Sequence, residues 1–192
     1  EEGFLYRVDM RLRPWGSSGS LVNALPGYMK YLRENARTWE KQALLKARPI
    51  AGDLALGDDM LQQAQLVLYA AAPELVRASV HDMKQRTESY LRIRGRAWGQ
   101  VKLGVGSIRD VEFVAQYLQL VHGAARPDVR SHNTLASLAL LGVHGLLTDD
   151  EQRVLTEGYA FLRTIEHHLQ LMHYQQISAG EYAELVEMAM DE

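Results

Sequence analysis

One alternating segment at the start of the chain, with no clear second one, constrains the fold more than any other feature. Between residues 6 and 13 apolar and charged residues alternate, with Tyr6, Val8, Met10 and Leu12 on one face and Arg7, Asp9, Arg11 and Arg13 on the other. This period of two predicts a β-strand with one buried face, ended by Pro14. A single strand cannot satisfy its backbone hydrogen bonds, so we expect its partners upstream of residue 1 or in another chain. The segment therefore indicates a fragment cut inside a domain.

The rest of the chain is predicted to be helical. Pro26 suits a first helical position and is followed by apolar residues at helical spacing. Thr38 is expected to cap a helix that runs to Arg48, and Pro73 opens a long helix. Further helices are expected over residues 58–71 and 133–141, after capping boxes at residues 107–110 and 148–151, and from about residue 177.

These patterns predict a mainly α fold, in which a helical bundle follows a remnant β-strand. We expect two domains. Residues 1–53 would hold the C-terminal remnant of the first domain, a strand with helices, and residues 54–192 would form the bundle.

Composition excludes several classes of protein. The chain of 192 residues has no cysteine, which excludes disulfides, thiolate zinc sites and cysteine nucleophiles. Its formal net charge of −3 gives no overall basic field for nucleic acid or lipid. It has neither an apolar run of the ~20 residues that a membrane helix needs nor a leader peptide at its start. We therefore expect a cytoplasmic protein with no nucleic-acid or membrane partner.

Asp9 is the first candidate for chemistry. On a strand it shares the polar face with Arg7, Arg11 and Arg13. A carboxylate there can bind Mg²⁺, and the guanidinium groups beside it can bind phosphate oxygens. The alternative is a solvated strand face with ordinary ion pairs, which the spacing alone favours.

Lys46 and Arg48 form the second candidate. They end the stretch that begins with Trp39, and Trp39, Ala43 and Lys46 share one helical face. An amphipathic helix with a packed tryptophan would explain the same pattern, and a cation is favoured at a helix C-terminus in any case.

The third candidate is the glycine-containing stretch 102–113. Its glycines lead into a helix N-terminus, where free N–H groups attract anions. Lys102 precedes this helix, and Arg109 begins a polar stripe with Glu112, Gln116 and Gln119. The alternative is that Asp110 completes the helix cap and that the stripe faces water.

Taken together and in this order, these stretches resemble the bifunctional glutamine synthetase adenylyltransferase/adenylyl-removing enzyme family. The resemblance rests on YRVDMRLRP at residues 6–14, WEKQALLKAR at 39–48, Gly52-Asp53, GSIRDVEF at 106–113 and FLRTIEHHLQ at 161–170. It runs from about residue 3 to residue 176. One departure is Ser107, where the family has the second glycine of its G-G-I-R-D-x-E-F motif. Serine is a good N-cap, so the helix start should survive, but a very close backbone approach to a ligand is in doubt.

The resemblance implies a fold and an activity. Members have two halves, each a polymerase-β-type nucleotidyltransferase domain followed by a helical bundle. One half transfers AMP from ATP to a tyrosine of glutamine synthetase, and the other removes it by phosphorolysis and releases ADP. The later stretch 161–170 is more similar to the de-adenylylating half. By this resemblance the first domain is a truncated nucleotidyltransferase domain.

The resemblance also implies roles for the candidate residues. Asp9 would be the third catalytic carboxylate and a Mg²⁺ ligand, while the family's Gly-Ser followed by two closely spaced aspartates is absent from this sequence. The implied phosphate-binding or nucleotide-binding residues are Arg11, Arg13, Lys46, Arg48, Lys102 and Arg109. The implied substrates are ATP or ADP and phosphate, and the implied protein partners are glutamine synthetase and a PII signalling protein.

Two other readings of the sequence stay open. The bundle could be a non-catalytic module that docks glutamine synthetase or a PII regulator. A PII uridylyltransferase-like enzyme is the nearer alternative, although stretch 39–48 favours the adenylyltransferase. Because one carboxylate cannot hold two metal ions, we expect this chain alone to be inactive.

Overall fold

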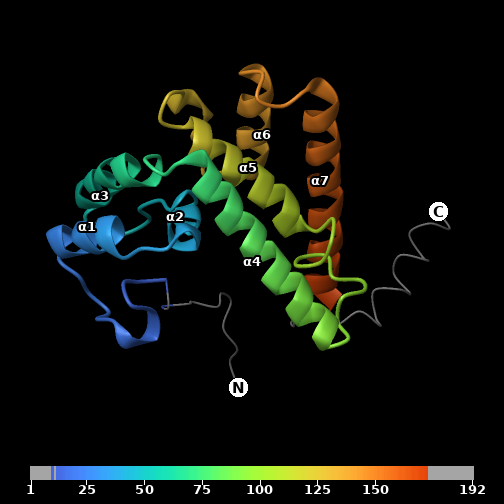
Figure 1. The fold of residues 1–192 in the computed structure, drawn as a ribbon, viewed down its shortest axis with the longest axis horizontal. Coiled ribbons are helices and arrows are strands. Elements are labelled where there is room, and N and C mark those ends of the chain that lie inside the picture. The colour runs from blue at the N-terminus through green and yellow to red at the C-terminus, as the bar shows by residue number, and fades with distance from the viewer. Residues whose placement is uncertain (1–9, 11, 173–192) are drawn as a thin grey trace.

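The computed structural model describes residue 10 and residues 12–172, and this part of the chain is mainly helical. Figure 1 shows α1, α2 and α3 at one end of the molecule and α6 and α7 at the other, with α4 and α5 crossing between them. The elements are η1 (Gly16–Ser18), α1 (Leu25–Glu34), α2 (Thr38–Leu44), α3 (Leu54–Leu68), α4 (Pro73–Ile93), α5 (Ile108–His122), η2 (Pro127–Val129), α6 (Thr134–Val143) and α7 (Asp149–Met172).

The remnant β-strand is not shown by this structure. Most of the segment, including Asp9 and Arg11, lies outside the described residues, as does the helix expected from residue 177. Met10 lies in a turn, and Leu12 and Arg13 lie in bends. Met10 and Leu12 were expected on a buried face but are 54% and 67% exposed, because no second layer of described residues covers them.

The two helices on either side of residue 50 differ from their predicted limits. α2 begins after Arg37, not after a Thr38 cap, and ends at Leu44 instead of Arg48. The N–H groups of residues 45–47 bond to carbonyls three residues back, so the chain tightens and leaves the α-helix early. α3 begins at Leu54, four residues before the predicted start, because the Asp53 carboxylate accepts a hydrogen bond from the Leu56 N–H at 3.1 Å.

The two predicted capping boxes have different outcomes. The one before α7 is confirmed: Glu151 accepts from the Thr148 N–H at 2.9 Å, and the Thr148 hydroxyl accepts from the Glu151 N–H at 3.3 Å. The one before α5 is wrong, because Ser107 is buried and its Oγ has no hydrogen-bond partner. Asp110 instead accepts from the Gly106 N–H at 2.8 Å, one residue further back.

Two apolar cores hold the helices together, and α5 contributes to both. One core joins α5, α6 and α7 through residues such as Ile108, Leu138 and Tyr159. The other joins α1, α3, α4 and the end of α5 through Met29, Leu32, Leu45, Ala64, Leu68, Val76 and Leu120. The second core includes residues on both sides of position 53, where the domain boundary was predicted, and that boundary stays a prediction. None of the described helices is long and apolar enough to cross a membrane.

Candidate functional site

The described cationic residues that the sequence singled out do not all lie together. Arg13 lies apart from the others, in the loop before η1. Its Nε donates to the Gly19 carbonyl at 3.1 Å and its Nη2 to the Ser17 carbonyl at 3.2 Å, and its Nη1 bonds to the Met10 carbonyl. In this structure the Arg13 guanidinium therefore organises the Gly-Ser turn.

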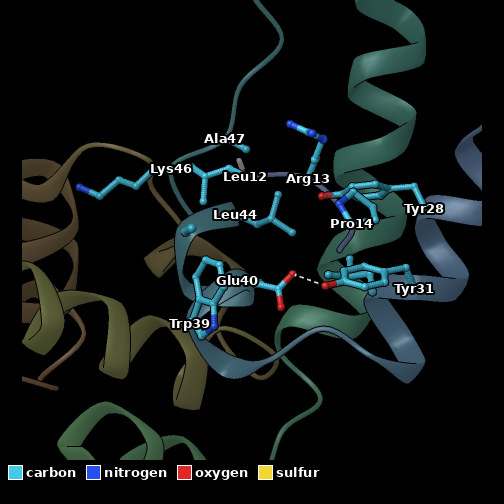
Figure 2. Close-up of a pocket in the computed structure, with 12 residues that line it drawn as sticks. Leu12, Arg13, Pro14, Tyr28, Tyr31, Trp39, Glu40, Leu44, Lys46 and Ala47 are labelled. Carbon is cyan, nitrogen blue, oxygen red and sulfur yellow. Dashed lines mark hydrogen bonds between the residues drawn. The ribbon is translucent and has the colours of Figure 1, made fainter. Parts of the chain in front are cut away.

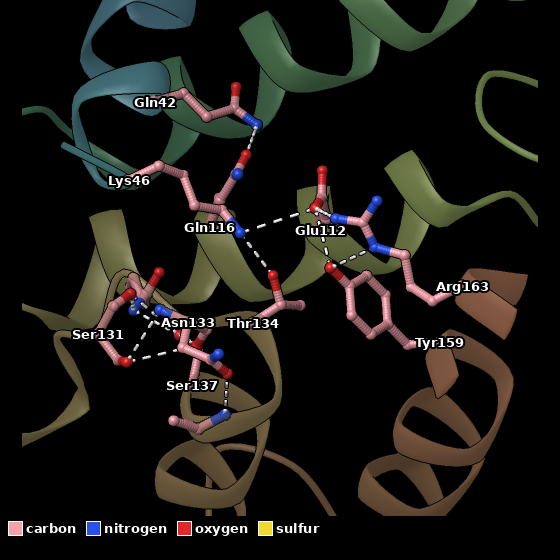
Figure 3. Close-up of polar contacts among 12 residues, drawn as sticks. Gln42, Lys46, Glu112, Gln116, Ser131, Asn133, Thr134, Ser137, Tyr159 and Arg163 are labelled. Atoms are coloured by element: carbon pink, nitrogen blue, oxygen red, sulfur yellow. Dashed lines mark hydrogen bonds and ion pairs between the residues drawn. The ribbon is translucent and has the colours of Figure 1, made fainter. Parts of the chain in front are cut away.

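Lys46 joins the end of the α2 region to α5 and α6. Its Nζ donates to Thr134 Oγ1 at 2.5 Å and lies 3.7 Å from Glu112 Oε1. Its side chain thus leaves the α2 region and reaches the polar contacts around α5 (Figure 3). One hydrogen bond leaves two of the three ammonium donors of Lys46 without a hydrogen bond to described protein groups.

Glu112 is the centre of a cluster of charged groups. Its Oε1 accepts a hydrogen bond from the Tyr159 hydroxyl at 3.1 Å and lies 3.7 Å from Arg163 Nη2. Arg163 Nε in turn donates to the Tyr159 hydroxyl at 3.1 Å, so the three side chains form a closed triangle between α5 and α7 (Figure 3).

Glu166 extends this cluster towards Lys102. It is 8% exposed and pairs with Arg163 Nη1 through Oε2, while its Oε1 lies 3.5 Å from Lys102 Nζ. Burial disfavours the charged form of Arg163, but hydrogen bonds to Glu166 and Tyr159 outweigh that effect and raise the pKa of Arg163. We call Lys46, Lys102, Arg109, Glu112, Tyr159, Arg163 and Glu166 the basic cluster.

Arg109 belongs to this cluster through Glu112, one turn further along α5. It is half-buried, and its guanidinium carbon lies 5.9 Å from the Phe113 ring centroid. Burial lowers the pKa of Arg109, and the nearby negative charge of Glu112 partly offsets this. Among the described residues Arg109 makes no ion pair, so its charge is uncompensated by direct contact. Arg48, by contrast, is exposed in the segment after α2.

The start of α5 does not have the free N–H groups that the sequence suggested. The N–H groups of Ile108 and Arg109 donate to the carbonyls of Val101 and Lys102, at 2.9 and 3.2 Å. The alternative of a water-facing polar stripe is also wrong for two of its members. Gln116 and Gln119 are buried because they bond across to other elements, Gln116 to Gln42 at 2.6 Å.

A pocket of about 340 Å³ lies between the N-terminal loop, α1 and α2 (Figure 2). Its walls are largely apolar and aromatic, with Tyr28 and Tyr31 of α1 on one side and Trp39 on the other. The Tyr31 hydroxyl donates to Glu40 Oε2 at 2.7 Å, and desolvation raises the pKa of Tyr31. Lys46 borders this pocket but points away from its interior, towards the basic cluster.

The structure brings together three sequence-predicted cations, Lys46, Lys102 and Arg109, around a group that sequence reasoning did not select. Arg163 and Glu166 lie in the stretch that supports the family resemblance and Tyr159 lies two residues before it, but no role was assigned to any of them. Their spacing of four and three residues places them on one face of α7, which was the available signal. The described residues contain no group of three or more His, Asp or Glu side chains that could hold a metal ion.

Comparison with known proteins then identifies the family. Residues 1–63 match the family model described as glutamate-ammonia ligase adenylyltransferase, and residues 74–178, more than half of the chain, match the model described as GlnD PII-uridylyltransferase. A relative from Streptomyces avermitilis, named bifunctional glutamine synthetase adenylyltransferase/adenylyl-removing enzyme, is 42% identical over 176 residues, which cover 91% of this chain. The chain belongs to this family of bifunctional enzymes.

Other members of the adenylyltransferase/adenylyl-removing family give the same picture. Relatives of the same name from Rhodopseudomonas palustris and Mycobacterium tuberculosis are 36% and 40% identical, over 93% and 89% of this chain. The chain spans less than a fifth of the length of these relatives, 18% and 17% respectively, and 18% of the Streptomyces avermitilis protein.

Proposed function

We propose that this chain is part of an enzyme that regulates glutamine synthetase. The enzyme would transfer AMP to a tyrosine of glutamine synthetase or remove it by phosphorolysis, and we favour the de-adenylylating half. The observation that carries this proposal is the 42% identity to a bifunctional adenylyltransferase/adenylyl-removing enzyme across 91% of the chain.

In this proposal Asp9 is a catalytic carboxylate on the last strand of a polymerase-β-type nucleotidyltransferase domain. It would hold Mg²⁺ together with carboxylates of the parent protein, since the described residues do not form a metal site of their own. Bound Mg²⁺ would neutralise phosphate charge during transfer. Arg11 and Arg13 would steady phosphate oxygens or the carboxylates beside Asp9.

The other cations of the proposal act on the phosphates of ATP or ADP, or on free phosphate. Lys46, Lys102 and Arg109 are supported in this role because they gather in the basic cluster. Arg48 is supported only by its place in the family motif and by its exposure. These residues would bind and orient phosphoryl oxygens through charge-assisted hydrogen bonds.

We place the parent enzyme in the cytoplasm, with glutamine synthetase and a PII signalling protein as its partners. The names of the relatives support the first partner, and the match of residues 74–178 to a PII-uridylyltransferase model supports the second. In this arrangement the helices from α4 onward would dock a partner in addition to binding phosphate.

The test uses the full-length parent enzyme with Asp9→Asn. This change keeps the size of the side chain but removes the negative charge that binds Mg²⁺, so the one reaction that this half carries out, AMP removal if it is the de-adenylylating half, should be abolished. The assay follows radiolabelled AMP on glutamine synthetase. Asp58→Asn, at an exposed position of α3, is the matched control and should keep full activity.

The 192-residue chain alone should show no turnover in the same assay, because it has one of the three expected carboxylates. Retained activity in the Asp9→Asn enzyme would end the proposed role of Asp9. Turnover by the isolated chain would show that the carboxylate set is complete without the parent protein.

A further inference from the structure

The basic cluster has more positive than negative charge in a chain that is acidic overall. Lys46, Lys102 and Arg163 pair with the two carboxylates Glu112 and Glu166, and Arg109 lies one turn before Glu112 on α5, so the cluster has an excess of two positive charges. The chain as a whole carries −3. A local excess of positive charge in partly buried surroundings favours binding of an anion.

The two carboxylates hold these cations but leave some of the N–H donors of the cations without a hydrogen bond. Glu112 Oε1 lies 3.7 Å from both Lys46 Nζ and Arg163 Nη2, which is longer than a hydrogen bond. Lys102 Nζ is likewise 3.5 Å from Glu166. These N–H donors can therefore turn to an incoming group with more negative charge and better-placed oxygens than the carboxylates offer.

Arg163 is the best-placed of the four cations. Its planar guanidinium is fixed on three sides: Nε by the Tyr159 hydroxyl, Nη1 by Glu166, and the plane itself over the Tyr159 ring, 5.3 Å from the centroid. The Arg163 side chain is still 36% exposed, so solvent and small ions reach it. A fixed guanidinium binds two phosphoryl oxygens with little loss of side-chain entropy.

We propose that Arg163 is a phosphate-binding residue and that Arg163, Lys102 and Lys46 form one site for a phosphoryl group. This inference rests on the proposed function and deepens it, since it places a phosphate site in the helical part of the chain. Glu112, Tyr159 and Glu166 hold the cations in place when no phosphoryl group is bound. The ligand is either free phosphate or the phosphate end of a nucleotide.

The test is direct binding of inorganic phosphate to the 192-residue chain, followed by phosphorus NMR at constant ionic strength. Saturable binding is expected. Arg163→Gln should weaken it at least about tenfold, because a charged hydrogen bond is lost. Lys102→Gln should weaken it about threefold, since Lys102 is more exposed.

Arg153→Gln is the matched control. Arg153 lies on the same helix and also pairs with carboxylates one turn away, Asp150 and Glu157, but it is outside the basic cluster. Its replacement should leave phosphate binding unchanged. Circular dichroism checks the fold of each variant. If Arg163→Gln fails to fold, Lys102→Gln carries the test, because its side chain is 46% exposed.

Titrations with ADP and adenosine separate the two ligand sources. A phosphoryl site is supported if phosphate and ADP compete, or if ADP binds and adenosine does not. In either case Arg163→Gln must also weaken the binding. Absence of saturable binding of both phosphate and ADP, or equal binding by wild type and both variants, overturns the inference. The assay measures no turnover, so its failure is distinct from retained activity in the Asp9→Asn enzyme.

Discussion

At the scale of single residues, Gly123, which follows the last residue of α5, and Gly158 inside α7 should respond in opposite ways to alanine. A Cβ on Gly123 would lie 2.5 Å from the Gln119 carbonyl oxygen and 2.6 Å from the Tyr69 ring. That ring cannot easily move, because Arg130 lies over it at 4.4 Å. We expect Gly123→Ala to destabilise the chain by about 1–3 kcal/mol.

Gly158, inside α7, is the matched position because a Cβ there meets nothing within 4 Å. Gly158→Ala should stabilise the chain by about 0.5–1 kcal/mol through the lower entropy of its unfolded state. Urea unfolding followed by circular dichroism measures both changes. Equal effects of the two substitutions would contradict the packing around Gly123.

At the scale of elements, the N-terminus of α7 should make the stability of the chain depend on pH in the acid range. Hydrogen bonds from the Thr148 N–H and hydroxyl lower the pKa of Glu151 from its ordinary value of 4.5. A carboxyl whose pKa is lower in the folded state stabilises the fold above its unfolded pKa, and this contribution is lost as pH falls through the folded pKa. Wild type should therefore lose stability as the pH falls below about 4.5.

The Glu151→Gln variant tests this dependence, since it keeps the hydrogen-bond acceptor but does not titrate. The midpoint temperature of thermal unfolding should fall less steeply from pH 6 to pH 3 for the variant than for wild type. Glu157→Gln, on the exposed face of the same helix, serves as the control. Parallel curves for wild type and Glu151→Gln would show that this cap does not contribute to the pH dependence of stability.

Element prediction from this sequence succeeded at the local cap of α7, missed the equally local Asp53 cap of α3, and failed where a distant contact decided the outcome. The cap at Thr148 is complete within four residues, so it could be found by spacing. Ser107 has the same local pattern, but its side chain is turned inward and buried. The early end of α2 at Leu44 was likewise missed, because the propensities of residues 45–48 suit a helix and tertiary packing decides otherwise.

At the scale of the whole molecule, one buried amide pair links the N-terminal helices to the rest. Gln42 Nε2 donates to Gln116 Oε1, and both residues are less than a tenth exposed. Gln116→Leu leaves the Gln42 amide buried without its partner, which should cost about 1–3 kcal/mol. The double variant Gln42→Leu, Gln116→Leu should cost less than the sum of the two single variants.

Chemical denaturation with a double-mutant cycle measures this coupling. Ala43→Ser, beside the pair on α2, controls for a small local change in polarity. Strict additivity of the two leucine substitutions would contradict the link between α2 and α5.

The candidate site could be predicted only in part, because its residues come from distant stretches of the chain. Lys46, Lys102 and Arg109 could be selected by residue type and family motif. Their meeting around Glu112 depends on how α2, α5 and α7 pack, which no local pattern contains. Arg163 was overlooked although its partner Tyr159 is on the same helix, because its contact with Glu112 of α5 depends on how the two helices pack.

The packing of α1 in one core with α3, α4 and the end of α5 has a practical consequence for anyone dissecting the parent protein. A recombinant piece that starts at residue 54 would lack Met29 and Leu32, which are 2% and 1% exposed here. Their removal would uncover Leu68, Val76 and Leu120 to water and invite aggregation during expression. Cloning boundaries drawn upstream of α1 keep that apolar surface covered.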